Sequence, residues 1–94
     1  MLRATIVRID GSTLLEDAEI QAQDARRGSG EGHIWRGVFT MPGVQLRPTM
    51  GETIHLRLDD RSFIAAVVTE VEGNRVHFRA RGRKPVQSDT AVLQ

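Results

Sequence analysis

Alternation of apolar and polar residues is clearest in the second half of the chain. Thr53–Leu58 and Val76–Ala80 alternate with a period of two, which is typical of strands with one buried face. Between them, Phe63–Val71 is rich in apolar and β-branched residues, and Gly73-Asn74 is a two-residue hairpin signal. Together these segments predict a three-stranded antiparallel meander over residues 53–81.

The register of this meander follows from placing Leu58 opposite Phe63 and Glu72 opposite Arg75. Both hairpins then assign the same residues to one face, and this agreement supports the register because a slip of one residue would invert it. The predicted inner face consists of Ile54, Leu56, Leu58, Phe63, Ala65, Val67, Thr69, Val71, Val76, Phe78 and Ala80. The predicted outer face consists of His55, Arg57, Ile64, Ala66, Val68, Glu70, Arg75, His77, Arg79 and Arg81.

The first half of the chain carries weaker signals of the same kind. Leu2–Ile9 and His33–Thr40 are predicted strands, and a type II turn at Met41-Pro42-Gly43 ends the second one. Leu14–Ala25 fits both a capped helix and an alternating strand, and we favour a strand because it completes a set of six. The sequence therefore predicts an all-β fold, a small six-stranded antiparallel barrel or two-sheet sandwich, with Trp35 filling one end.

The remaining segments have the composition of connections. Arg26–Gly32 is a Gly-rich loop, and Val44–Met50 is a loop or short edge strand interrupted by Pro48. With 94 residues the chain has the size of one domain. We assign residues 1–84 to a single β domain and 85–94 to a short, flexible C-terminal tail.

Composition narrows the function classes. The chain has no Cys, so disulfides, thiolate metal sites and a Cys nucleophile are excluded. The first residues lack the apolar core of a signal peptide, and the longest apolar run, Phe63–Val68, is too short to span a membrane. These features predict a soluble cytoplasmic protein. Thirteen basic against twelve acidic residues leave the chain nearly neutral, although every basic residue except Lys84 is Arg.

No catalytic, cofactor or metal site is predicted. His33, His55 and His77 are equally spaced, but the predicted register separates the last two by about 16 Å, too far to share an ion. Asp59-Asp60 fits a turn better than a pair of acid–base carboxylates. The glycines of 28–32 lack the flanking strand, helix and Lys of a phosphate loop. We therefore expect a protein that is not an enzyme and uses no cofactor.

Two sets of residues on the outer face of the predicted meander suggest binding. Ile64, Ala66 and Val68 form an apolar strip on its outer face, which suggests a homodimer interface or a contact with another protein partner. The alternative is an anion-binding module for nucleic acid or a nucleotide. Its candidate residues share the same outer face, and Arg binds phosphate through two parallel hydrogen bonds; they are Arg57, Arg75, Arg79 and Arg81. The primary hypothesis is thus a self-associating assembly module.

The stretch from Gly51 to Leu58, together with the hairpin segment from Gly73 to Arg79, resembles the second half of a PilZ-type barrel. This resemblance implies cyclic-dinucleotide binding, which in that family depends on an Arg-x-x-x-Arg motif and an Asp-x-Ser-x-x-Gly motif. The nearest segments here are Arg57–Arg61 and Asp60–Ala65, which overlap inside the meander, and the second ends in Ala instead of Gly. No binding residue is therefore carried over from that family.

Overall fold

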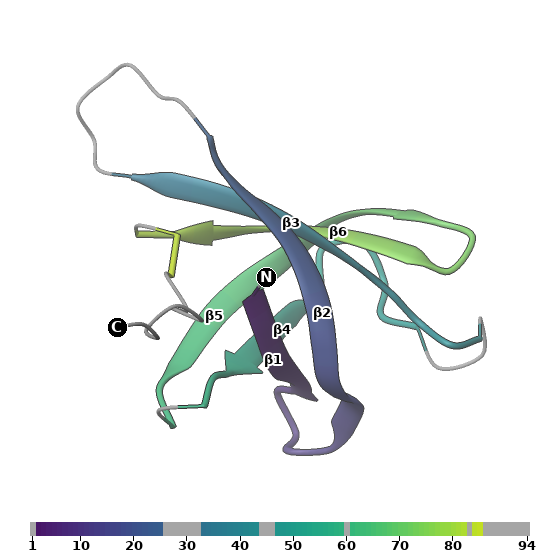
Figure 1. Cartoon of the computed structure of the whole chain (residues 1–94). Coiled ribbons are helices and arrows are strands. Elements are labelled where there is room, and N and C mark those ends of the chain that lie inside the picture. Colours follow the sequence, from purple (N-terminus) through teal and green to yellow (C-terminus); the bar gives the residue numbers. More distant parts are fainter. Residues whose placement is uncertain (1, 26–32, 44–46, 60, 83, 86–94) are drawn as a thin grey trace.

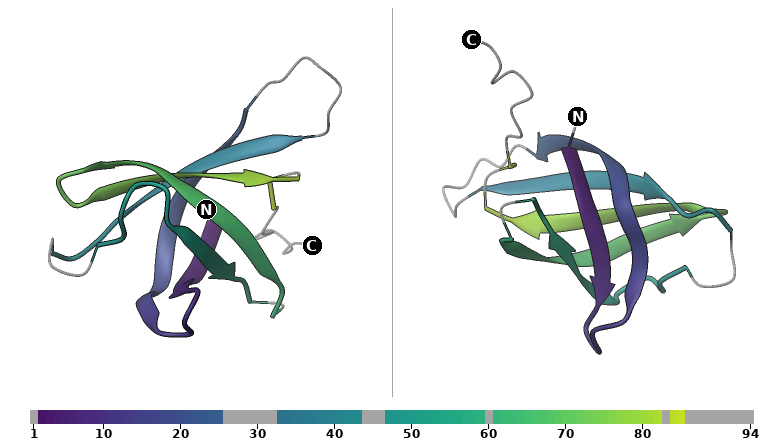
Figure 2. Two further views of the ribbon diagram at one scale, coloured as in Figure 1. Left: turned by 180° about the vertical axis from the view of Figure 1, so that it is seen from behind. Right: turned by 60° about the horizontal axis from the view of Figure 1, so that its bottom comes forward.

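The computed structural model describes all residues except 1, 26–32, 44–46, 60, 83 and 86–94. Its six strands are β1 (Leu2–Arg8), β2 (Thr13–Ala25), β3 (Ile34–Thr40), β4 (Thr53–Arg57), β5 (Phe63–Glu72) and β6 (Arg75–Arg81). They close into an antiparallel barrel with the order β1-β2-β3-β6-β5-β4, which confirms the predicted all-β barrel (Figures 1 and 2). The predicted Gly-rich loop and most of the predicted tail lie outside the described residues. Within the described ranges, no helix is long and apolar enough to cross a membrane.

Segment 14–25 belongs to strand β2, and the strand that we favoured over a helix is therefore confirmed. Its first part, Thr13 to Ile20, pairs with β1, and its second part, Gln21 to Ala25, pairs with β3. One long strand thus belongs to two parts of the barrel wall, and it curves between them (Figure 1). The helix alternative fails because every second residue around Ala18 and Ile20 must face the core, which only an extended strand allows.

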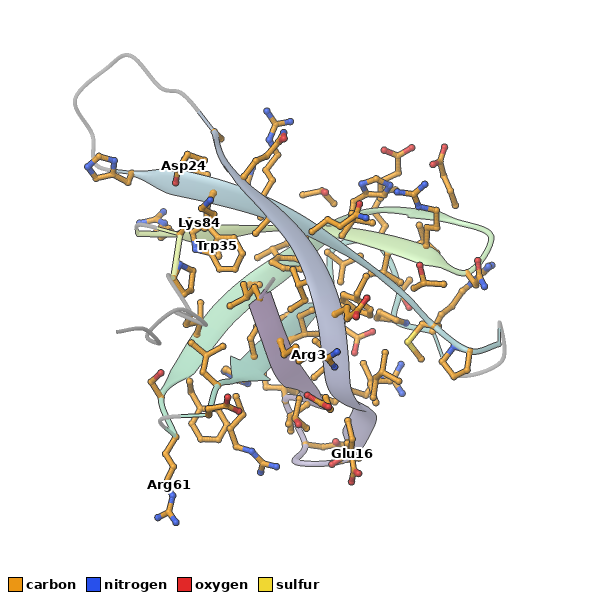
Figure 3. The ribbon with its side chains drawn as sticks, in the orientation of Figure 1. Arg3, Glu16, Asp24, Trp35, Arg61 and Lys84 are labelled. Carbon is orange, nitrogen blue, oxygen red and sulfur yellow. The ribbon has the colours of Figure 1, made fainter. Side chains whose placement is uncertain are left out.

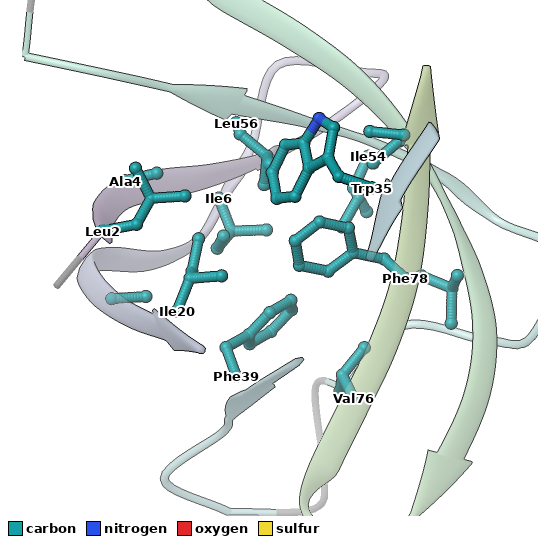
Figure 4. Close-up of a cluster of buried hydrophobic side chains, with 14 of the residues drawn as sticks. Leu2, Ala4, Ile6, Ile20, Trp35, Phe39, Ile54, Leu56, Val76 and Phe78 are labelled. Atoms are coloured by element: carbon teal, nitrogen blue, oxygen red, sulfur yellow. The ribbon is translucent and has the colours of Figure 1, made fainter. Parts of the chain in front are cut away.

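The barrel interior is filled by apolar side chains from all six strands (Figure 4). Trp35 is fully buried and packs edge-on against Phe78 with 5.4 Å between ring centroids, as predicted for a residue that fills the barrel. Gly37 lies opposite Phe78 in the β3–β6 register. A Cβ atom at Gly37 would lie 2.5 Å from Cζ of Phe78, so the ring occupies the space that any other side chain would need.

The predicted pairing of β4 with β5 is wrong by one residue. Arg57 faces Phe63, whereas the sequence suggested Leu58 opposite Phe63. Leu58 N donates to Ser62 O at 3.0 Å, and Arg61 has φ of 71°. Only three residues therefore lie between Leu58 and Ser62, a loop that ends in a left-handed residue and is common in β-hairpins. The prediction allowed four residues, and the difference inverts the faces of β5.

A second irregularity lies in the β5–β6 hairpin. The predicted pairs hold from the turn as far as Glu70 opposite His77, but Val68 then faces Phe78 instead of Arg79. Thr69 is the extra residue of this bulge. Because a bulge shifts the register by one residue, β6 keeps its predicted inner face while the first part of β5 does not.

The proposed apolar interface strip is consequently part of the core. Ala66 and Val68 are 2% and 1% exposed, and Ile64 packs against the core as a half-buried residue. The other side of the same strand faces outward instead, with Phe63 58% exposed. The prediction that Ile64, Ala66 and Val68 form an outer strip is therefore wrong, because the short loop before β5 and the bulge within it reverse this part of the strand.

The segment before β4 closes one part of the barrel. Pro48 is fully buried, and Gly51 N and Val68 N take part in backbone hydrogen bonds between this segment and β5. Glu52 accepts a hydrogen bond from Arg8 Nε at 2.9 Å and another from Thr49 N at 3.0 Å. Burial by itself would raise the pKa of Glu52, but these hydrogen bonds and the Arg8 charge outweigh it and hold the pKa below its ordinary value.

Candidate anion-binding surface

Three exposed arginines lie together on the outer surface of β3 and β6. Arg36 is directly opposite Arg79 in the β3–β6 register, and Arg81 follows two residues later on β6. Directly opposed residues of an antiparallel pair have Cβ atoms about 5 Å apart, and residues two apart on one strand are separated by roughly 7 Å. We call Arg36, Arg79 and Arg81 the arginine cluster.

Neighbouring positions do not neutralise this cluster. Arg36 has Gln23 as its partner on β2, Arg79 has Val67 on β5, and Arg81 has Ile34 on β3. The described residues two positions away from the cluster on β3 and β6, which lie on the same face, are also uncharged or basic. No described residue forms an ion pair or hydrogen bond with a side chain of the cluster. Three arginines are therefore neighbours in the sheet, and their side chains are not paired with any described residue.

The other two predicted anion-binding residues do not join the cluster. Arg57 lies on β4, opposite Phe63, and β5 separates it from β6. Arg75 lies at the far end of β6, opposite Glu72, and it lines a cleft with residues of β2. Of the four arginines that the sequence placed on one face, only Arg79 and Arg81 are adjacent in the barrel.

Acidic residues gather at the other end of the β5–β6 hairpin. Glu70 is opposite His77, as predicted, and Glu72 Oε1 is 3.7 Å from His77 Nε2. Because Glu72 also faces Arg75, this end of β6 is close to neutral. The positive charge of β6 is thus concentrated at its C-terminal half.

The other candidate groups stay apart. His33 directly precedes β3 and is exposed, His55 packs edge-on against Phe63 at 6.3 Å, and His77 lies on β6. Within the described ranges, no three His, Asp or Glu side chains gather as metal ligands. Asp59 is exposed in the turn after β4, and its neighbour Asp60 lies outside the described residues.

Arg36 is the member of the cluster that sequence reasoning missed. It follows Trp35 and precedes Gly37, and both of those residues face inward, so the alternation of β3 already predicts an exposed Arg36. Its proximity to Arg79 required knowledge that β3 pairs with β6, although β3 ends at Thr40 and β6 begins only at Arg75. No local pattern of residues predicts which distant strands pair.

The fold and this surface define a small closed β-barrel with an external cluster of three arginines that form no ion pair with a described residue. Each guanidinium can donate two parallel hydrogen bonds to a phosphate, sulfate or carboxylate group. A comparison of the chain with protein-family models, with curated proteins and with solved structures found no match.

Proposed function

We propose that this protein is a binding module that holds the phosphate backbone of a nucleic acid against the arginine cluster. The single observation that carries the proposal is the direct opposition of Arg36 and Arg79 with no carboxylate in a neighbouring position. Like charges directly opposite each other destabilise a sheet, and a polyanion removes that repulsion.

The aromatic residues support backbone contact in place of base stacking. Trp35, Phe39 and Phe78 are buried in the core, and the exposed Phe63 lies opposite Arg57, away from the cluster. Proteins that bind single strands without sequence preference usually stack bases on exposed aromatic rings. A duplex that presents only its phosphates therefore fits the cluster better than a single strand does.

The salt dependence of binding tests this proposal. Three phosphate contacts predict that the logarithm of the association constant for duplex DNA falls with a slope of about −2.7 against the logarithm of salt concentration. Arg36→Gln is expected to reduce the size of this slope by about 0.9, and Arg79→Gln combined with Arg81→Gln by about 1.8. Fluorescence anisotropy of a labelled duplex, measured over a salt series at low ionic strength, gives these slopes.

A matched control is Arg57→Gln, because Arg57 is also an exposed strand arginine but lies outside the cluster. This variant should leave the slope unchanged. Absence of duplex binding at low salt, or an equal change of slope in Arg57→Gln, would contradict the proposal.

Self-association is a second candidate function, and one observation favours it. Phe63 is 58% exposed, and it is followed on the outer side of β5 by exposed Ala65 and half-buried Val67. A large exposed apolar side chain beside other apolar groups suits an interface between two copies of the chain. This strip replaces the one suggested by the sequence, and it lies on the opposite side of the same strand.

Light scattering separates this candidate from nucleic-acid binding. A dimer mass for the wild-type chain that returns to a monomer mass in Phe63→Glu would support self-association. The control is Ile9→Glu, which introduces the same charge at another exposed apolar residue, 72% exposed and outside the strip. A monomer at high protein concentration would remove this candidate without affecting the first.

A further inference from the structure

A cleft opens in the barrel wall where β2 separates from β3. Their pairing ends at Gln21 opposite Val38, and the two strands then diverge (Figure 1). The cleft has a volume of about 620 Å³. Buried Ala18, Phe39 and Met41 form its apolar floor.

Both walls of the cleft are strand edges. β2 pairs with β1 through residues 13–20, and no described strand pairs with the other side of this part of β2. β3 pairs with β6 as far as Thr40, but its pairing with β2 already ends at Val38. Asp17 lies in a bulge of β2 with φ of 51°, donates its N–H to Thr5 Oγ1 at 3.3 Å and accepts at its carbonyl from Arg3. The other main-chain groups that these two edges direct into the cleft pair with no described strand, so they can pair with an added extended segment.

Carboxylates line the β2 side of the opening. Glu16, Asp17 and Glu19 are exposed cleft residues, and Glu16 lies at the lower end of β2 (Figure 3). Arg3 binds Asp17 at 3.2 Å and Glu19 at 3.1 Å, whereas Glu16 forms no ion pair with a described residue. The opposite wall carries a single charged residue, Arg75, and the balance at the opening is acidic.

We propose that this cleft binds an extended basic segment of a partner protein, which adds a strand to the edge of β2. In such a segment alternate side chains point to opposite faces. One set, apolar, would contact Ala18, Phe39 and Met41, and the other set, Lys or Arg, would lie beside the carboxylates. The same carboxylates oppose edge pairing between two copies of this chain, since like charges would meet.

The probe for this proposal is a short synthetic peptide of alternating Lys and Val, with a peptide of alternating Glu and Val as its counterpart. The full chain is titrated with each peptide while backbone amide shifts and amide hydrogen exchange are recorded. The Lys–Val peptide should bind and slow the exchange of the free edge amides of β2 between Leu15 and Glu19, Asp17 excepted, and of Thr40. Tight binding of the Glu–Val peptide, or binding without slower exchange at these amides, would overturn the proposal.

Charge reversal locates the contact. Glu16→Lys should weaken binding of the Lys–Val peptide about tenfold at low salt, because one attraction becomes a repulsion. Glu70→Lys makes the same change at an exposed residue of β5 that is not part of the cleft, and it should leave the affinity unchanged. Equal losses in the two variants would assign the binding to net charge and would remove the proposed site. Thermal melts of both variants establish that the barrel is intact.

Discussion

The two sides of β5 between residues 63 and 68 have nearly the same composition but different surroundings. Ile64, Ala66 and Val68 face the core, whereas Phe63, Ala65 and Val67 lie on the outer side. Nothing in the residue types separates the two sets, since each contains one large, one small and one β-branched or aliphatic residue. Apolar character therefore identifies the inner face of a strand only where the other face is polar, and β5 lacks that contrast.

The largest expected effect comes from placing the same charge on the two sides of β5. Ala66→Asp buries a carboxylate without a partner and should cost about 4 kcal/mol of unfolding free energy, enough to unfold much of the protein. Ala65→Asp adds the charge at an exposed position and should change the unfolding free energy by less than about 0.5 kcal/mol. Urea denaturation followed by circular dichroism measures both. Similar losses in the two variants would show that the assignment of faces is wrong.

A second test extends the comparison to β3, where Gly37 has no side chain and the ring of Phe78 fills the space. Gly37→Ala places a Cβ atom 2.5 Å from Phe78 Cζ, and the ring must shift. We expect a loss of about 1–3 kcal/mol, which is typical of an overpacked core. Gly43→Ala serves as its control, because a Cβ atom there would meet nothing within 4 Å. Unfolding free energies that are equal for the two variants would contradict this packing.

The Arg8–Glu52 ion pair is an intermediate case, because both side chains are partly exposed. The pKa of Glu52 is lowered in the folded protein, so its contribution to stability is complete above its ordinary value of 4.5 and is lost as the pH falls through the lower folded value. Glu52→Gln should cost about 1 kcal/mol at neutral pH and should flatten the stability profile below pH 4.5. Denaturation midpoints across the acid range measure this effect, and a profile that is as steep in Glu52→Gln as in the wild-type chain would contradict it.

The smallest expected effect concerns the outer side alone. Arg36→Gln removes a like-charge contact with Arg79 and should raise the unfolding free energy by a few tenths of a kcal/mol at low salt. The gain should vanish in about 1 M salt, where charges are screened within a few ångströms. Thermal melts at the two salt concentrations measure it, with Arg57→Gln as the control. A gain that persists at high salt would have another cause.

The sequence predicted the strands more reliably than it predicted the members of the candidate anion-binding surface. Alternation and a run of apolar and β-branched residues located the strands, although segment 14–25 also fitted a helix, and the two-residue turn at Gly73-Asn74 set the first pairs of the β5–β6 hairpin correctly. The agreement between the two hairpins, however, did not guarantee the register. The short loop after Leu58 and the bulge at Thr69 each shift it by one residue, and the two shifts compensate. β4 and β6 therefore kept their predicted faces, while the first part of β5, from Phe63 to Val68, was inverted between them.

The sequence by itself determined the all-β class, the number of strands and the exposure of Arg79 and Arg81, because these follow from period-two alternation within single strands. Tertiary structure alone decided which strands are neighbours and how loops set their offset. It brought Arg36 beside Arg79, removed Arg57 and Arg75 from that group, and opened the cleft between β2 and β3. The physical reason is that pairing between strands distant in the chain depends on backbone geometry and on closure of the barrel. Neither of these produces a periodic pattern of apolar and polar residues.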